Sequence, residues 1–173
     1  ALGNCHVHLS QVTALVEDDT PLLEMPEPPQ DAVCDLIGQH VAGLVPDGAT
    51  LKIGYGSTPS AVARHLADKQ DLGIHTEMVG DSLLRLIECG AVTNRRKNFM
   101  PGKMVGSFAL GSRALYRYLD RNPLFEMHPV DFTNDPCIAG QNDNLVAINA
   151  SMQVDLLGQC GSESHGSLPY SGT

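Results

Sequence analysis

The sequence predicts an α/β domain with a mostly parallel sheet covered by helices. From residue 31 onward, short apolar runs typical of strands alternate with segments whose apolar residues recur at helical spacing. Turn and cap residues, such as "PDG" at 46–48 and Gly90, separate these segments. Because strands that alternate with helices are joined by crossovers, they pair in parallel and the helices cover the sheet.

The first half of the domain holds the most regular patterns. A helix is predicted from Asp31, a suitable N-cap, to the "PDG" stop. A strand over "TLKIGY" and a second helix follow, with Thr58 as its N-cap and Pro59 at its first position. The apolar residues expected to share the inner faces of these elements are Val33, Ile37, Val41, Leu44, Val45, Leu51, Ile53, Tyr55, Val62, Ala63, Leu66 and Ala67.

The alternation continues to the end of the chain. "LGIHTEMV" at 72–79 predicts a strand, and "DSLLRLIECG" predicts a helix capped by Asp81. A strand near "MVGSFAL" and a helix from Ser112 to about Arg121 come next, followed by strands at "FEMHPV", "LVAINAS" and "QVDLLG".

The amino-terminal segment differs from this domain. Residues 4–16 alternate loosely and predict one or two strands, with His6 and His8 on one face. That spacing suits a metal pair, but ordinary strand histidines are favoured and no metal site is predicted. The prolines of "PLLEMPEPPQ" indicate an extended crossing segment. We therefore place a preceding segment at 1–29 and the main domain at 30–173.

Composition limits the function. The net charge of −9 argues against a duplex nucleic-acid binder, and the absence of Trp with 5% aromatic residues argues against stacking on single strands. No apolar run is long enough to cross a membrane, and no signal-peptide pattern is visible. The five scattered cysteines fit reduced thiols, so a soluble cytoplasmic protein is expected.

The stretch "GYGSTP" after the first strand is the clearest loop motif. Gly54 and Gly56 let the backbone approach a ligand, and the following helix directs N–H groups at an anion or a developing oxyanion. A dinucleotide fingerprint requires a third glycine where Pro59 stands, although Glu77 follows at about the spacing of its acidic residue. Dinucleotide binding and a purely structural turn therefore remain alternatives.

Glu77 is the most informative acidic residue. It ends the strand beside the glycine loop, at the sheet edge where open α/β sheets bind ligands. A carboxylate that faces such a loop can attack a thioester carbonyl while backbone N–H groups stabilise the tetrahedral oxygen. A solvated or helix-capping glutamate is the structural alternative.

Four blocks in this order carry a family resemblance: "GATLKIGYGSTPSAVARHL", "DLGIHTEMVGDSLLRLIECGAVTNRRK", "FTNDPCIA" and "AINASMQVDLLGQ". From about Glu24 onward, the chain resembles the acetyl-CoA hydrolase/transferase family. Within it, the resemblance is to the 4-hydroxybutyrate or butyrate:acetate CoA-transferase branch, of the class I type. The resemblance implies a CoA-transferase (NagB/RpiA-like) fold, so 30–173 is expected to be a catalytic domain truncated at its C-terminus.

The resemblance also implies a ping-pong transfer of CoA from a short-chain acyl-CoA to a carboxylate such as acetate. By this resemblance Glu77 is the catalytic nucleophile, which forms a mixed anhydride and then a glutamyl-CoA thioester. Asn134 of the "TND" block is the second catalytic residue, which positions the first. CoA is then a substrate rather than a permanently bound cofactor, and a homo-oligomer of the full-length protein is expected. The loop residues implied to contact CoA are Gly54, Tyr55, Gly56, Ser57 and Thr58.

The chain departs from the family pattern in two places. It stops at Gly172-Thr173, where the family continues into a Gly-Gly segment, and it begins in the middle of the family sequence. A fragment whose isolated activity is in doubt is therefore expected. Tyr55 is bulkier than the aliphatic residue expected there, which predicts either a narrower acyl pocket or simple packing.

Other readings stay open at this stage. Hydrolysis of acetyl-CoA would use the same residues as transfer, while a nicotinamide-binding oxidoreductase domain or a non-catalytic binding fragment would not. "RRK" at 95–97 with Lys103 fits either the CoA phosphates or a solvated turn. His75 would either tune Glu77 from the same strand face or pack in the interior.

Overall fold

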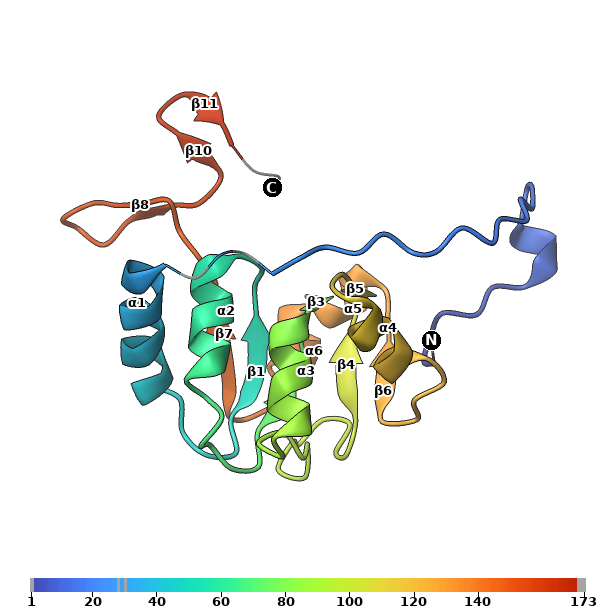
Figure 1. Ribbon diagram of the computed structural model, residues 1–173, viewed down its shortest axis with the longest axis horizontal. Coiled ribbons are helices and arrows are strands. Elements are labelled where there is room, and N and C mark those ends of the chain that lie inside the picture. Colours follow the sequence, from blue (N-terminus) through green and yellow to red (C-terminus); the bar gives the residue numbers. More distant parts are fainter. Residues whose placement is uncertain (1, 28, 30, 171–173) are drawn as a thin grey trace.

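The structure is a computed structural model that describes residues 2–27, 29 and 31–170. An amino-terminal arm leads into an α/β domain, and a carboxyl-terminal arm with short hairpins leaves it (Figure 1). In chain order the elements are η1 (Leu9–Gln11), α1 (Ala32–Gly43), β1 (Thr50–Ile53), α2 (Ser57–Arg64), β2 (Gly73–Ile74), β3 (Met78–Val79), α3 (Asp81–Glu88), β4 (Met104–Gly106), β5 (Phe108–Ala109), α4 (Arg113–Leu119), β6 (Phe125–Met127), α5 (Val130–Thr133), α6 (Pro136–Ala139), β7 (Leu145–Ile148), β8 (Gln153–Val154), β9 (Cys160–Gly161), β10 (Ser164–His165) and β11 (Leu168–Pro169).

A parallel sheet in the order β7-β1-β2-β4-β6 forms the centre of the domain. β1 pairs in parallel with β7 and β2, and β4 pairs in parallel with β6. A parallel bridge between His75 and Val105 joins the two groups, and another between Gly3 and Met127 adds the beginning of the arm beside β6. β3 and β5 form a further parallel pair beyond β2 and β4. The predicted α/β fold with a mostly parallel sheet is confirmed.

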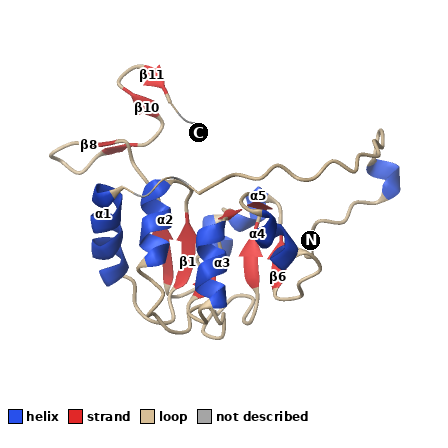
Figure 2. Ribbon diagram, in the orientation of Figure 1, coloured by secondary structure: helices blue, strands red, loops and turns tan. Residues whose placement is uncertain are grey.

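Helices cover both faces of this sheet. α1, α2 and α3 lie side by side in front of it, whereas α5 and α6 lie behind it on the connection from β6 to β7 (Figures 1 and 2). Leu51 and Ile53 of β1 are buried in the core that also contains Val62 of α2. Because successive strand residues point to opposite faces, Lys52 points behind the sheet, toward α5. This alternation decides which side chains reach the site.

The first helix meets its neighbour through a small residue. A Cβ added to Gly38 would lie 2.7 Å from the backbone carbon of Ala61 in α2, so only glycine allows this approach. Asp31 caps α1 as predicted, since its carboxylate accepts from Val33 N. Of the apolar residues expected to point inward, Val45 is buried, but Val33 and Leu44 are 64% and 81% exposed. Ile37 is also exposed, so α1 buries fewer of these residues than the sequence predicts.

Two predicted helix starts are wrong. Gly56 and Gly80 are the N-caps of α2 and α3, without side-chain capping bonds, so neither Thr58 nor Asp81 has that role. The Asp81 carboxylate instead accepts from the backbone N and the Oγ of Ser112, at 2.8 and 2.6 Å. Likewise, α2 ends at Arg64, which leaves Ala67 exposed rather than inward.

The prediction of strands over residues 4–16 is also wrong. This stretch is exposed arm with the short helix η1, whose N-cap is His8. The His8 Nδ1 accepts from Ser10 N, so His6 and His8 do not share a strand face. An alternating pattern forms a strand only where a neighbour pairs with it, and the arm has none at these residues.

The described residues of the proline-rich segment form no helix or strand and run as an extended connection toward α1, as predicted (Figure 1). The proposed boundary at 29/30 involves Gln30, which lies outside the described residues, as do Pro28 and the terminal residues 171–173. The strand predicted at 72–79 is divided into β2 and β3, and "QVDLLG" forms a hairpin strand, β8, that pairs with β9 in antiparallel fashion. The division after β2 places Glu77 at the edge of the sheet.

Candidate active site

The glycine loop connects the carboxyl end of β1 to α2. Gly54 N donates to Ile148 O at 2.9 Å, and a Cβ on Gly54 would meet Asn149 Oδ1 at 3.0 Å. Gly56 has a φ of +127°, which side chains rarely adopt. Pro59 stands in the first turn of α2, where a missing N–H breaks no helical bond. The N–H groups at the start of α2 therefore point out of this sheet edge.

The backbone around Glu77 is fixed by the strands on both sides. Glu77 O accepts from Ser107 N at 2.8 Å and from Phe108 N at 3.1 Å. The preceding Thr76 is 1% exposed, and its hydroxyl donates to Ile53 O and accepts from Ile53 N. These bonds tie the β2–β3 junction to the end of β1. They hold Glu77 beside the glycine loop, where the sequence places it.

The Glu77 side chain takes part in a chain of polar contacts behind the sheet. Asn134, the C-cap of α5, donates from Nδ2 to Glu77 Oε2 at 2.7 Å. Its amide oxygen accepts from Lys52 Nζ at 2.8 Å. The two residues predicted to be catalytic are thus in direct contact although 57 positions separate them. Lys52 joins them without having been predicted from the sequence.

A pocket of about 160 Å³ opens at this point. It brings Gly54 and Tyr55 of the loop together with Glu77, while Asn134 contacts Glu77 from behind. Gly56, Ser57 and Thr58 do not line it, and the last two lie 3.6 Å from Cys34 Sγ through their hydroxyls. The lining residues are Lys52, Ile53, Gly54, Tyr55, Thr76, Glu77, Met78, Phe108 and Asn149.

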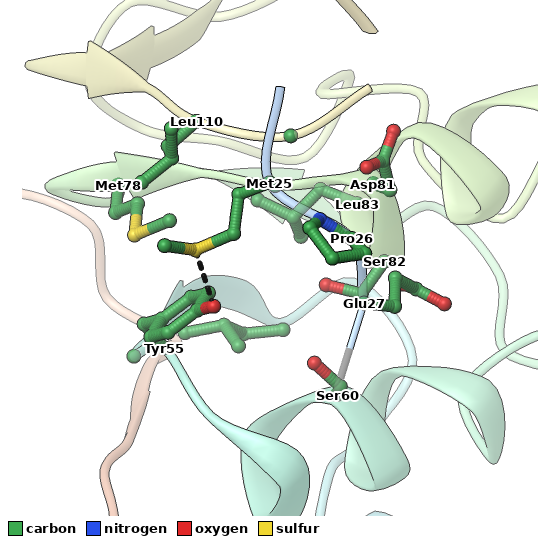
Figure 3. A pocket seen from close by; sticks show the side chains of 14 residues that line it. Met25, Pro26, Glu27, Tyr55, Ser60, Met78, Asp81, Ser82, Leu83 and Leu110 are labelled. Atoms are coloured by element: carbon green, nitrogen blue, oxygen red, sulfur yellow. Dashed lines mark hydrogen bonds between the residues drawn. The ribbon is translucent and has the colours of Figure 1, made fainter. Parts of the chain in front are cut away.

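A second, smaller pocket lies next to the first and involves the extended segment before α1 (Figure 3). Met25 N donates to Gly111 O at 3.1 Å, and the Tyr55 hydroxyl points at the Met25 sulfur. Arg85 forms two bonds to the Glu27 carboxylate at 2.8 and 2.7 Å. Tyr55 lines both pockets, and its hydroxyl contact with Met25 joins the loop to the crossing segment.

The basic residues at 95–97 do not line the Glu77 pocket. They precede β4 and therefore lie at the amino edge of the parallel sheet, opposite Glu77. Arg95 pairs with Asp71 at 2.7 Å, and Lys103 Nζ donates to Pro123 O. Lys97 is 4% exposed, and burial lowers its pKa to about 8. The alternative that they meet CoA phosphates is not supported by this placement.

His75 is an interior residue, as the packing alternative predicts. It is fully buried, and its Nε2 lies 2.9 Å from Thr133 O. Burial lowers the pKa of His75, and the nearby Lys97 and Lys52 charges act in the same direction. Its ring stands 6.3 Å from that of Phe99. His75 therefore supports the α5 end that carries Asn134.

The described residues supply two further facts about the surroundings of the site. Within residues 2–27, 29 and 31–170, no group of three or more His, Cys, Asp or Glu side chains is arranged to hold a metal ion. Over the same described part, no helix is long and apolar enough to cross a bilayer.

Comparison with known proteins identifies relatives of the chain. Residues 111–173 match the family model of the acetyl-CoA hydrolase/transferase C-terminal domain. The chain is 50% identical, over 99% of its length, to a succinyl-CoA:cyclohexane-1-carboxylate CoA transferase of Geobacter metallireducens. The resemblance to the acetyl-CoA hydrolase/transferase family is thereby confirmed.

Two further matches extend this family resemblance. A 4-hydroxybutyrate coenzyme A transferase of Clostridium kluyveri is 42% identical over 99% of the chain. The solved structure of a 4-hydroxybutyrate CoA-transferase from Porphyromonas gingivalis matches 89% of the chain with a TM-score of 0.84 and 41% identity. The chain covers 39%, 40% and 39%, respectively, of the Geobacter, Clostridium and Porphyromonas proteins, so it spans about two fifths of their length.

Lys52 is the residue of the site that the sequence interpretation missed. One signal for it exists: a lysine between the apolar residues Leu51 and Ile53 of a strand inside a parallel sheet. A charge is rarely buried in such a strand unless it is paired. Its partner Asn134 comes from a distant segment that sequence spacing does not place.

Proposed function

We propose that the protein transfers CoA from a short-chain acyl-CoA to a carboxylate, with Glu77 as the nucleophile. The observation that carries this proposal is the Glu77 carboxylate, held by Asn134 at 2.7 Å in a pocket shared with the glycine loop. A carboxylate in this place has a donor on one oxygen and leaves the other for attack. Backbone donors at the adjacent loop suit the oxyanion that the attack creates.

The proposed reaction proceeds in two exchanges at Glu77. A carboxylate oxygen of Glu77 attacks the thioester carbonyl, and the C–S bond breaks. The CoA thiolate departs, and the acyl group stays on Glu77 as a mixed anhydride. The thiolate then attacks the γ-carbonyl carbon of Glu77 and releases the first acid, which leaves a glutamyl-CoA thioester. An acceptor carboxylate then attacks the glutamyl-CoA thioester, which releases the CoA thiolate and forms a second anhydride. The thiolate attacks the acceptor's carbonyl carbon in this anhydride, so the new acyl-CoA departs and the Glu77 carboxylate is restored. No external proton donor is needed, because each leaving group departs as an anion.

Transfer is preferred to hydrolysis because the matched Geobacter, Clostridium and Porphyromonas proteins are all named as CoA transferases. For the substrates we propose 4-hydroxybutyryl-CoA, butyryl-CoA or acetyl-CoA as donor and acetate or a similar small acid as acceptor. Cytoplasmic localisation, a thioester intermediate and a homo-oligomeric full-length protein belong to the same proposal.

The test is an assay of acyl-CoA with and without a carboxylate acceptor, in the full-length protein that carries this chain. Glu77→Gln keeps the shape of the side chain but removes the nucleophile, and should lower the rate at least about 1,000-fold. Glu88→Gln, an exposed residue at the far end of α3, is the matched control and should keep the wild-type rate. Full turnover by Glu77→Gln would exclude the mechanism. Equal CoA release with and without acceptor would indicate hydrolysis.

A further inference from the structure

Lys52 is a half-buried lysine between two buried apolar residues of a central strand. Its neighbours Leu51 and Ile53 are 0% and 3% exposed, and β1 pairs with a strand on each side. The ammonium group reaches behind the sheet and donates to Asn134 Oδ1 at 2.8 Å. Among the described residues that line the Glu77 pocket, Lys52 is the one with a positive charge.

The hydrogen-bonding chemistry fixes the orientation of the amide between the two charges. An ammonium group only donates, and an ionised carboxylate only accepts. The Asn134 amide satisfies both neighbours when its oxygen faces Lys52 and its nitrogen faces Glu77. If the amide were reversed, oxygen would face carboxylate and NH₂ would face ammonium, so both contacts would be repulsive. Lys52 and Glu77 thus favour the same orientation of the Asn134 amide.

We propose that Lys52 is a positioning residue that acts on Glu77 through Asn134. This inference rests on the proposed function, since it assigns the part that orients the nucleophile. Lys52 keeps the Asn134 NH₂ directed at Glu77 Oε2 and polarises the amide, which strengthens that donor. When thiolate attacks the γ-carbonyl of the anhydride, negative charge develops on the Glu77 oxygen. The same N–H then stabilises the oxyanion without having to reorient.

A direct contact between Lys52 and the acceptor carboxylate is the competing role, because Lys52 also lines the pocket. The two roles differ in a double-mutant cycle. A residue that acts through Asn134 loses its effect once the Asn134 amide is removed, whereas a residue that binds substrate does not. The Michaelis constant for the acceptor separates them as well.

The experiment compares wild type, Lys52→Met, Asn134→Ala and the double variant in the full-length protein, with donor and acceptor concentrations varied. We expect Lys52→Met to lower kcat about tenfold and to leave the acceptor KM within about twofold. The double variant should be no more than about twofold slower than Asn134→Ala. Lys69→Met, in the loop between α2 and β2 at the opposite sheet edge, is the control for the loss of a lysine.

A second double-mutant cycle replaces Lys52→Met by Lys52→Gln, which keeps a polar side chain in β1. Circular dichroism and the thermal midpoint of unfolding verify that every variant is folded. Multiplicative losses in the double variant, or an acceptor KM raised about tenfold by Lys52→Met, would overturn the inference. So would a Lys52→Met enzyme with wild-type kcat. Lack of transfer by the wild type would remove the proposed function itself, and this inference with it.

Discussion

Lys97→Met should remove a pH-dependent part of the free energy of unfolding. Lys97 is 4% exposed, and its Nζ donates to Ile74 O at 3.0 Å and to Lys103 O at 2.7 Å. Carbonyl oxygens compensate the buried charge less fully than water does. Burial therefore lowers the pKa of Lys97 from 10.5 to about 8, against a smaller opposing effect of Glu126.

The sign of the effect follows from the two pKa values. The unfolded chain keeps the Lys97 proton up to about pH 10.5, whereas the folded protein releases it above about pH 8. Between these values the unfolded state binds more protons, so the free energy of unfolding rises with pH. One pKa unit corresponds to about 1.4 kcal/mol, which gives a total rise of about 3 kcal/mol from Lys97.

Urea unfolding gives the free energy of unfolding of wild type and of Lys97→Met, below pH 8 and near pH 10.5. The rise from Lys97 is the change with pH in the wild type minus the change in the variant. All other titratable groups are common to both proteins, so their contributions cancel in the difference. The Lys69→Met variant, run in parallel, should follow the wild-type pH dependence. Curves for wild type and Lys97→Met that stay parallel across the range would refute the reasoning.

Three further predictions test the packing and the site. Gly38→Ala, whose Cβ would meet Ala61 at 2.7 Å, should destabilise by about 1–3 kcal/mol in urea unfolding. Gly43→Ala in the same helix meets open space and should be neutral or stabilise by up to about 1 kcal/mol; the reverse order would contradict the α1–α2 contact. Gly56→Ala, at a φ of +127°, should cost about 1–3 kcal/mol and lower kcat, and an unchanged melting temperature would contradict the need for glycine there. Since burial lowers the pKa of His75, the unfolded state alone gains its proton as the pH falls below 6.5, and this lowers stability; an NMR titration with a His75 pKa at or above 6.5 would disprove it.

Local periodicity predicted the parts of the fold that depend on neighbouring residues in the chain. The strand-loop-helix unit of β1 and α2 and the Asp31 cap of α1 are examples. The placement of Glu77 at the carboxyl edge of the sheet followed because parallel strands end on the same side. Because β2 pairs in parallel with β1, the residues that follow the two strands, Glu77 and Gly54, line the same pocket.

The parts that failed depend on distant partners. Residues 4–16 alternate like a strand but have no strand beside them, and Asp81 binds Ser112 instead of capping its own helix. Lys52 shows the same limit at the site. Its partner Asn134 lies 82 positions away, and spacing along the sequence does not reveal that this residue at the end of α5 contacts Lys52.

The most direct test of the central claim is to trap the covalent intermediate on Glu77. The full-length protein is incubated with acyl-CoA, reduced with borohydride, digested and analysed by mass spectrometry. Reduction of a glutamyl-CoA thioester turns the Glu77 carboxyl into a primary alcohol, so the peptide that contains Glu77 should lose one oxygen and gain two hydrogens. That change should be confined to this peptide and should require acyl-CoA. An unmodified Glu77 peptide from a protein that turns over, or the same change at another carboxylate, would contradict the assignment of Glu77 as the nucleophile.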